Sequence, residues 1–191
     1  MSTSRSARTQ FGRATATTDA FGAVWRIDPQ TNQLASGPIR VGGGPSDVEV
    51  AFGSVWVALA DDGAVARIDP ATNEVGEAIR VGAGPFNLAV GAGAVWVLNA
   101  NDGTVMRIDP KRGDVAGTAI RVGSVPSDLA VDADSIWITN GDRGHLLRID
   151  PVTGETRDEL AVSGGPFAVA VGADSVWVTG NFAGTLTRID P

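Results

Sequence analysis

The chain contains no cysteine and only one histidine among its 191 residues. The absence of cysteine excludes disulfide bonds, thiolate metal sites and cysteine nucleophiles. A single histidine excludes any site that needs two histidines from one chain. Basic residues are also in the minority, with 15 lysines and arginines against 22 acidic residues and a net charge of -7. This charge makes nucleic acid or an anionic membrane an unfavourable partner.

Long hydrophobic runs are also absent from the sequence. No segment fits a secretory signal or a membrane-spanning helix, so the compartment remains undetermined. No stretch carries a sustained 3.6-residue period, which predicts that helix is nearly absent. Residues 1–20 are rich in serine, threonine and arginine, and we expect a disordered tail there. The remainder has enough apolar residues for a globular domain, and its 25 glycines indicate many turns.

Residues 21–191 consist of an internal repeat of about 40 residues. The tetrapeptide Arg-Ile-Asp-Pro occurs five times at intervals of 40 or 41 residues. A tryptophan that follows valine or isoleucine, and a proline that precedes an apolar run, each recur four times in the same register. Three markers with one period predict a repeat architecture.

Each repeat is predicted to contain four short strands. In the repeat at 85–125, apolar runs at 86–90, 94–98, 104–108 and 118–122 are separated by glycine-containing turns such as Asn-Asp-Gly and Asp-Pro-Lys-Arg-Gly. Four antiparallel strands per unit of this length are typical of a blade of an all-β propeller. A β-solenoid is the main alternative, but its coils are shorter and lack hairpin turns.

The segment 95–110 reads Val-Trp-Val-Leu-Asn-Ala-Asn-Asp-Gly-Thr-Val-Met-Arg-Ile-Asp-Pro. It resembles the repeats of bacterial YVTN-type propellers and of the virginiamycin B lyase-like family. The resemblance covers residues 21–191 and implies the propeller fold, whereas such repeats serve many functions. The lyase-like enzymes are known for catalytic histidines and a divalent metal. This chain has His145 alone, so that chemistry does not carry over residue by residue.

The repeat divides the chain into three full blades flanked by two partial ones. The partial blades lie at 21–44 and 166–191, and the full blades at 45–84, 85–125 and 126–165. Together they supply 17 predicted strands, because the first partial blade holds a third and a fourth strand and the last holds strands one to three.

Three ways of closing a ring fit this number of strands. One chain could form a four-bladed ring, two chains could exchange ends in one eight-bladed ring, or the end could complete an irregular fifth blade. Closure matters because an open end leaves an apolar face and a strand edge in water. We favour the homodimer, since blades this short usually occur in larger rings.

The first repeat is irregular. The residues leading to Trp25 match those leading to Trp56 in a second strand, yet Arg26 begins the third-strand motif directly. About ten residues, or one hairpin, are therefore predicted to be missing between Trp25 and Arg26. A natural deletion, a junction and a coincidence all remain open, as does a truncated or engineered origin.

Oxygen-bearing side chains gather on one face of the predicted propeller. Asp47, Asn87 and Asp128 stand on first strands, which line the channel, and with Glu49 they are predicted to bind a ligand at the channel mouth. Their side-chain oxygens could coordinate Ca²⁺ or Mg²⁺, or bind a polar or cationic molecule. For this face as a whole we favour the alternative that the side chains accept hydrogen bonds from backbone N–H groups, because the hairpin loops recur in every blade, and we predict no cofactor. Asp47, Asn87 and Asp128 are the better candidates for a ligand site, although Ala168 interrupts their series. The loops between second and third strands add Asp61, Asp62, Asn99, Asn101, Asp102, Asn140, Asp142 and Asn181.

Two residues are weak catalytic candidates. Glu49 replaces the alanine of the other repeats, so it is either a channel base or ligand, or a substitution whose carboxylate reaches channel water. His145 stands at a turn, as a general base or as an exposed loop residue. The repeated arginines, such as Arg67, are predicted to pair with carboxylates or carbonyls of the neighbouring blade.

These patterns favour a non-enzymatic scaffold or binding module that associates with itself, as part of a larger propeller or as an engineered repeat protein. Its partners would be a second copy, another protein or a small polar ligand. A metal-assisted lyase or hydrolase of the resembled family is the alternative function.

Overall fold

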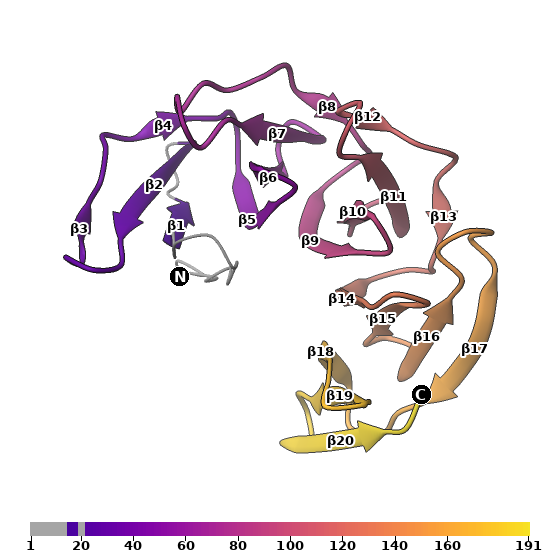
Figure 1. The fold of residues 1–191 in the computed structure, drawn as a ribbon. Coiled ribbons are helices and arrows are strands. Elements are labelled where there is room, and N and C mark those ends of the chain that lie inside the picture. The colour runs from indigo at the N-terminus through magenta and orange to yellow at the C-terminus, as the bar shows by residue number, and fades with distance from the viewer. Residues whose placement is uncertain (1–14, 19–21) are drawn as a thin grey trace.

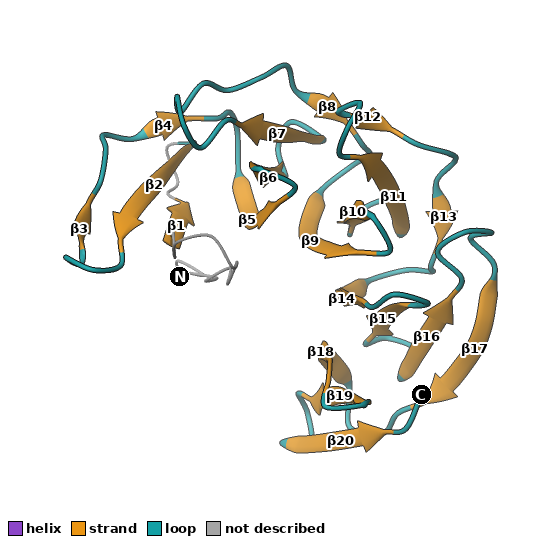
Figure 2. Cartoon of the chain, viewed as in Figure 1, coloured by secondary structure: helices purple, strands orange, loops and turns teal. Residues whose placement is uncertain are grey.

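The computed structural model describes residues 15–18 and 22–191, and the predicted all-β class is confirmed there. Strands, turns and loops make up these residues, and none of them belongs to a helix able to cross a membrane. The strands form five antiparallel sheets that follow one another along an open, C-shaped arc (Figure 1). Loops join consecutive strands within each sheet and consecutive sheets along the arc (Figure 2).

Each sheet takes its strands from one contiguous part of the chain. Sheet 1 contains β1 (Thr15–Thr18), β2 (Ala23–Asp28), β3 (Gln33–Leu34) and β4 (Ile39–Arg40). Sheet 2 contains β5 (Pro45–Ala51), β6 (Ser54–Leu59), β7 (Ala64–Ile68) and β8 (Ile79–Arg80). Sheet 3 contains β9 (Pro85–Gly91), β10 (Ala94–Asn99), β11 (Thr104–Asp109), β12 (Asp114–Val115) and β13 (Ile120–Arg121). Sheet 4 contains β14 (Pro126–Val131), β15 (Ile136–Asn140), β16 (His145–Ile149) and β17 (Thr156–Ala161). Sheet 5 contains β18 (Pro166–Gly172), β19 (Ser175–Gly180) and β20 (Thr185–Ile189).

The strand order within a sheet is that of a propeller blade. The first strands β5, β9, β14 and β18 lie along the inside of the arc, and later strands follow outward (Figure 1). The outermost strand is broken in three sheets. In sheet 3 it consists of the short strands β12 and β13, which both pair with β11, so the predicted run at 118–122 is only in part a strand.

The first repeat is regular, and the predicted gap in it was wrong. Val24 pairs with Ile39 as Val65 pairs with Ile79, so residues 22–29 are the counterpart of 63–70 and β2 is an ordinary third strand. Trp25 thus corresponds to Ala66 and not to the repeated tryptophan. No residues are missing here, which removes the observation that suggested an engineered origin.

The predicted number of strands was also wrong, because β1 was missed. It pairs with β2 in the register in which β6 pairs with β7, so it takes the place of a second strand. Residues 15–18 of the expected tail are therefore part of sheet 1, while the rest of that expectation lies outside the described residues.

The core lies between the sheets and repeats four times. In sheet 3, Trp96 and Leu98 point to one side and pack with Ile136 and Ile138 of sheet 4. We call the side of a sheet that carries the repeated tryptophan its tryptophan face, and the opposite side its aliphatic face. In sheet 1 the names refer to the corresponding sides, although Ala16 stands at the tryptophan position. Each of the four clusters joins the tryptophan-face side of one sheet to the aliphatic face of the next.

The two ends of the arc do not pair with each other within the described residues. β3 and β4 pair with β2, and β20 pairs with β19 alone, so these residues do not form the four-bladed ring of one chain. Closure by a second chain remains a prediction.

Candidate functional site

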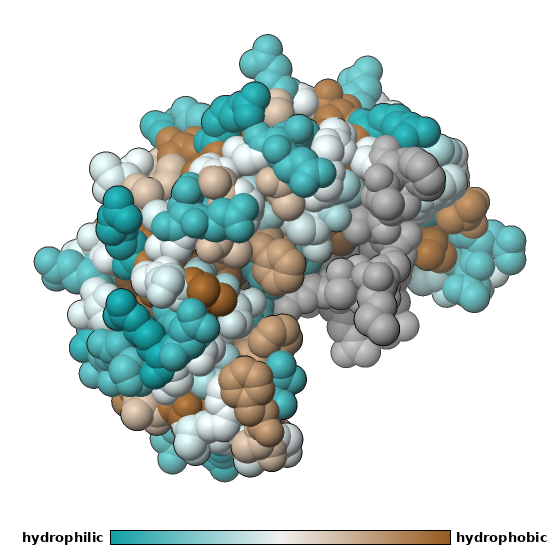
Figure 3. Space-filling view, turned by 180° about the vertical axis from the view of Figure 1, so that it is seen from behind, coloured by the Kyte–Doolittle hydropathy of each residue, from teal (hydrophilic) through white to brown (hydrophobic). Residues whose placement is uncertain are grey.

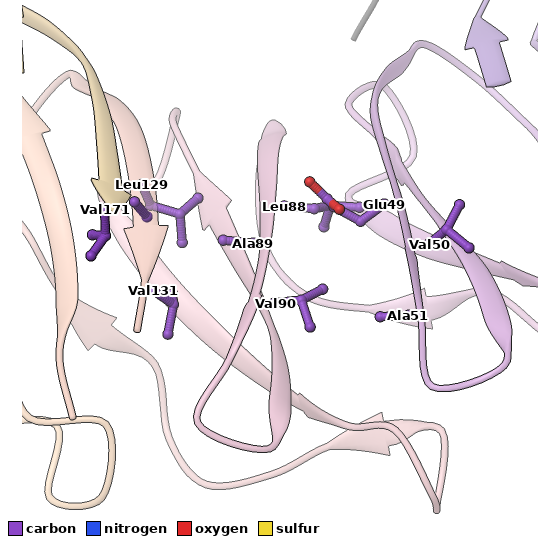
Figure 4. A pocket seen from close by; sticks show the side chains of 10 residues that line it. Glu49, Val50, Ala51, Leu88, Ala89, Val90, Leu129, Val131 and Val171 are labelled. Carbon is purple, nitrogen blue, oxygen red and sulfur yellow. The ribbon is translucent and has the colours of Figure 1, made fainter. Parts of the chain in front are cut away.

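A groove of about 500 Å³ runs along the inside of the arc (Figure 4). Its walls are residues of the first strands β5, β9, β14 and β18. Glu49 is ionisable, and the other nine lining residues are valine, alanine or leucine. Leu88 and Leu129 are buried between sheets, so the groove surface combines backbone with the smaller apolar side chains and with Glu49, the one predicted site residue that lines it.

The other three predicted site residues lie between sheets. Asp47, Asn87 and Asp128 are only 3%, 5% and 4% exposed. The Oδ2 atom of Asp47 accepts the backbone N–H of Leu88 at 2.8 Å, and that of Asp128 accepts the N–H of Val169 at 3.0 Å. Asn87 donates from Nδ2 to Oδ1 of Asp128 at 3.0 Å. These side chains tie each inner strand to the next one along the arc.

The series of tie residues is interrupted at Ala168. Each tie reaches forward from a first strand to the first strand of the following sheet. Sheet 5 is followed by no further sheet in the described residues, and Ala168 stands at the tie position. The 41-residue separation between partners was visible in the sequence, but the buried N–H group that each carboxylate meets was not.

The oxygen-bearing side chains between the second and third strands form a rim, and two of its aspartates hold the loops that enter sheets 2 and 3. Oδ2 of Asp62 accepts the N–H of Gly43 at 2.7 Å, and Oδ2 of Asp102 accepts the N–H of Ala83 at 2.6 Å. These bonds tie the turn between the second and third strands to the linker before the first strand. Two other rim residues, Asn99 and Asn140, are buried. Their side-chain amides donate to backbone carbonyls of the linkers before sheets 3 and 4.

A second groove of about 670 Å³ is lined by three rim residues, Asp61, Asp62 and Asn101, and by Arg80. Within residues 15–18 and 22–191, no three acidic or histidine side chains are grouped so that they could hold a metal ion. The residues predicted to bind Ca²⁺ or Mg²⁺ are thus distributed along the arc. They do not form a common set of metal ligands in the described residues.

His145 lies on the outer half of its blade. Its Nδ1 atom is 2.6 Å from Oε1 of Glu159, so the third strand β16 is linked to the fourth strand β17. Glu49 is on the inner strand β5 of another sheet. The structure therefore does not bring the two catalytic candidates together.

The repeated arginines bind mainly within their own sheets, contrary to the prediction of partners in the next blade. Arg67 lies 5.0 Å from the ring centroid of Trp56, directly across the strand pair, and donates from Nε to Oγ of Ser54 at 2.8 Å. The same stack and serine bond recur in sheets 4 and 5. Arg26 fits the prediction, since it donates to the carbonyl of Pro70 in the neighbouring blade.

Three carboxylates of the Asp-Pro turns have lowered pKa values. Hydrogen bonds from the backbone N–H of Thr153 and then from the Arg157 side chain lower the pKa of Asp150 to about 2. Backbone N–H groups also lower the pKa of Asp28 and of Asp109. These carboxylates stabilise turns, so their low pKa values point to structure and not to a catalytic acid.

No protein-family model and no curated protein sequence matches the chain. Among solved structures, virginiamycin B lyase from Staphylococcus aureus superposes with a TM-score of 0.77 at 18% identity, over 92% of this chain and 62% of the lyase. BamB from Moraxella catarrhalis gives 0.76 at 16% identity, over 97% of this chain and 59% of BamB. Kuenenia stuttgartiensis hydrazine synthase superposes with a TM-score of 0.71 at 18% identity, over 82% of this chain and 48% of the synthase.

These similarities confirm the expected resemblance to virginiamycin B lyase-like propellers at the level of the fold. The chain spans less than two thirds of the length of each of these three proteins. Since the three have different names and share an architecture, the fold alone does not select a function.

Proposed function

We propose that the chain is a non-enzymatic propeller module that serves as a scaffold and binds a partner. One observation carries the proposal. Three of the four predicted site residues on the inner strands, Asp47, Asn87 and Asp128, are buried and bonded between sheets. They contribute to the stability of the arc.

The groove along the first strands supports a binding role. Its valine and alanine side chains suit a short apolar body, and the Glu49 carboxylate adds a negative charge to the groove (Figure 4). The ligand class is therefore a small molecule with an apolar part and a cationic or polar group.

Replacing Asp128 by alanine tests the structural role. The change would leave the Val169 N–H and the Asn87 amide buried without an acceptor, so we expect the free energy of unfolding to fall by about 1–3 kcal/mol or more in urea titrations. Glu77→Ala is the matched control, because Glu77 is exposed, and we expect it to change stability little. Unchanged stability in Asp128→Ala would contradict the proposal.

A lyase is the second candidate, favoured by the similarity to three streptogramin-type lyase structures. One of them is an inactive S. aureus lyase with quinupristin, which supplies the probe. We expect the chain with Mg²⁺ to leave quinupristin intact by mass spectrometry. Conversion of quinupristin above the buffer rate, abolished in Glu49→Gln with unchanged unfolding, would establish the lyase and overturn our proposal.

A further inference from the structure

The tryptophan face of sheet 5 is uncovered at one end of the arc. Leu186 on β20 is 63% exposed, whereas its counterparts in sheets 2, 3 and 4 are fully buried, namely Val65, Val105 and Leu146. Trp177 is half-buried, although the same tryptophan in those sheets is at most 1% exposed. Hydrophobic side chains are visible on the surface where sheet 5 lies (Figure 3). An apolar face of this kind is unfavourable in water.

The aliphatic face of sheet 1 is open at the other end. Ile27 and Leu34 pair across β2 and β3 and lie on this face. Leu34 is 59% exposed and Ile27 half-buried. The counterparts of Ile27 in the following sheets are at most 1% exposed, namely Ile68, Ile108 and Ile149. The two ends therefore expose opposite faces of the same repeating interface.

The internal interfaces show how these two faces fit. Between sheets 2 and 3, Trp56 and Val65 of the tryptophan face share one cluster with Ile108 and Val115 of the aliphatic face. In sheet 5, Trp177 and Leu186 occupy the positions that Trp56 and Val65 hold in sheet 2. In sheet 1, Ile27 and Leu34 occupy the positions that Ile108 and Val115 hold in sheet 3.

We propose that copies of the chain associate head to tail, with the tryptophan face of sheet 5 packed on the aliphatic face of sheet 1 of a second copy. The contact is heterologous, because two different surfaces meet, and it repeats the packing found four times inside the chain. This surface is separate from the inner groove, so the proposal stands whether or not the groove binds a ligand.

The contact is weaker than an internal one. Ala168 replaces the carboxylate that ties a first strand to the next sheet, and no described strand of sheet 1 holds the first position. The intermolecular contact therefore has apolar packing without the buried hydrogen bonds. We expect reversible, concentration-dependent association.

Three lysine substitutions with the same charge change test the proposal by light scattering on a sizing column. Leu186→Lys places a charge on the tryptophan face, and Leu34→Lys places one on the aliphatic face. Val152→Lys is the control, since Val152 is 87% exposed on the turn between β16 and β17. We expect the wild type and the control to exceed 19.6 kDa increasingly with concentration. Each end variant should associate at least ~10-fold more weakly, since burying an unpaired charge is costly.

Mixing the two end variants separates this contact from a symmetric one. Leu34→Lys retains the tryptophan face and Leu186→Lys retains the aliphatic face, so an equal mixture should form a dimer that neither variant forms alone. A wild type that stays at 19.6 kDa at every concentration would overturn the proposal. So would a Leu34→Lys variant that dimerises alone, because two sheet 5 faces would then be in contact.

Discussion

At the scale of single residues, a recurring unit joins the second and third strands of each blade. An arginine stacks on the tryptophan opposite it and donates to a serine at the start of the second strand. Sheet 3 keeps the stack, with Arg107 at 5.9 Å from the ring centroid of Trp96, but has Ala94 in place of the serine. Nε of Arg107 is buried with no hydrogen-bond partner among the described residues.

Restoring that acceptor should stabilise the chain. We expect Ala94→Ser to raise the free energy of unfolding by about 1 kcal/mol, the usual net value of one hydrogen bond, and the melting temperature by about 2–4 °C. Serine fits the same buried position in three other sheets, for example at Ser54, so crowding should be small. Ser54→Ala is the reciprocal control and should destabilise the chain. An unchanged or lower melting temperature for Ala94→Ser would contradict the assignment of Arg107 Nε as an unsatisfied donor.

At the scale of elements, the Asp-Pro turns depend on ionised carboxylates. Oδ1 of Asp150 accepts the N–H groups of Val152 and Thr153 at 2.7 and 3.0 Å, and Asp69 and Asp109 bind the corresponding turns in the same way. A protonated carboxyl is a poorer acceptor, so each turn is strongest when its aspartate is charged.

Stability should therefore decrease in acid. The pKa of Asp150 is lowered from 3.8 to about 2, so the folded chain binds that proton less readily than the unfolded chain. Its contribution is complete above pH 3.8 and is lost as the pH falls towards 2. Urea midpoints measured between these pH values should fall less steeply for Asp150→Asn than for the wild type. Equal slopes would contradict the assignment.

The same elements show what the sequence could predict. Apolar runs and glycine turns located the first three strands of sheets 2 to 5, because hairpins are local. The strand β1 was missed because Thr-Ala-Thr-Thr has no apolar alternation, and it is recognisable only from its pairing with β2. Periodicity identified Asp47 and Asp128 as special positions. Their function as ties depends on N–H groups about 40 residues away, which no local pattern reveals.

At the scale of the whole molecule, the arc is a one-dimensional stack in which each described sheet packs mainly against the sheets before and after it. Inner sheets are covered on both faces, and β10 is buried along its whole length. β20 has one covered side and, in the described chain, no fourth strand beside it. Stability in such stacks decreases towards the ends, because terminal units have one neighbour.

Amide hydrogen exchange should reveal this gradient and its response to self-association. In dilute protein we expect amides of β10 and β11 to exchange most slowly and those of β20 much faster, since local opening at an end breaks one interface. Raising the protein concentration should slow exchange in sheets 1 and 5 while the middle sheets change little. Leu186→Lys should remove that concentration dependence and leave β10 as protected as in the wild type. If sheet 5 were as protected as sheet 3 in dilute Leu186→Lys, its stability would not depend on the neighbouring face, and the stack would fold as one cooperative unit.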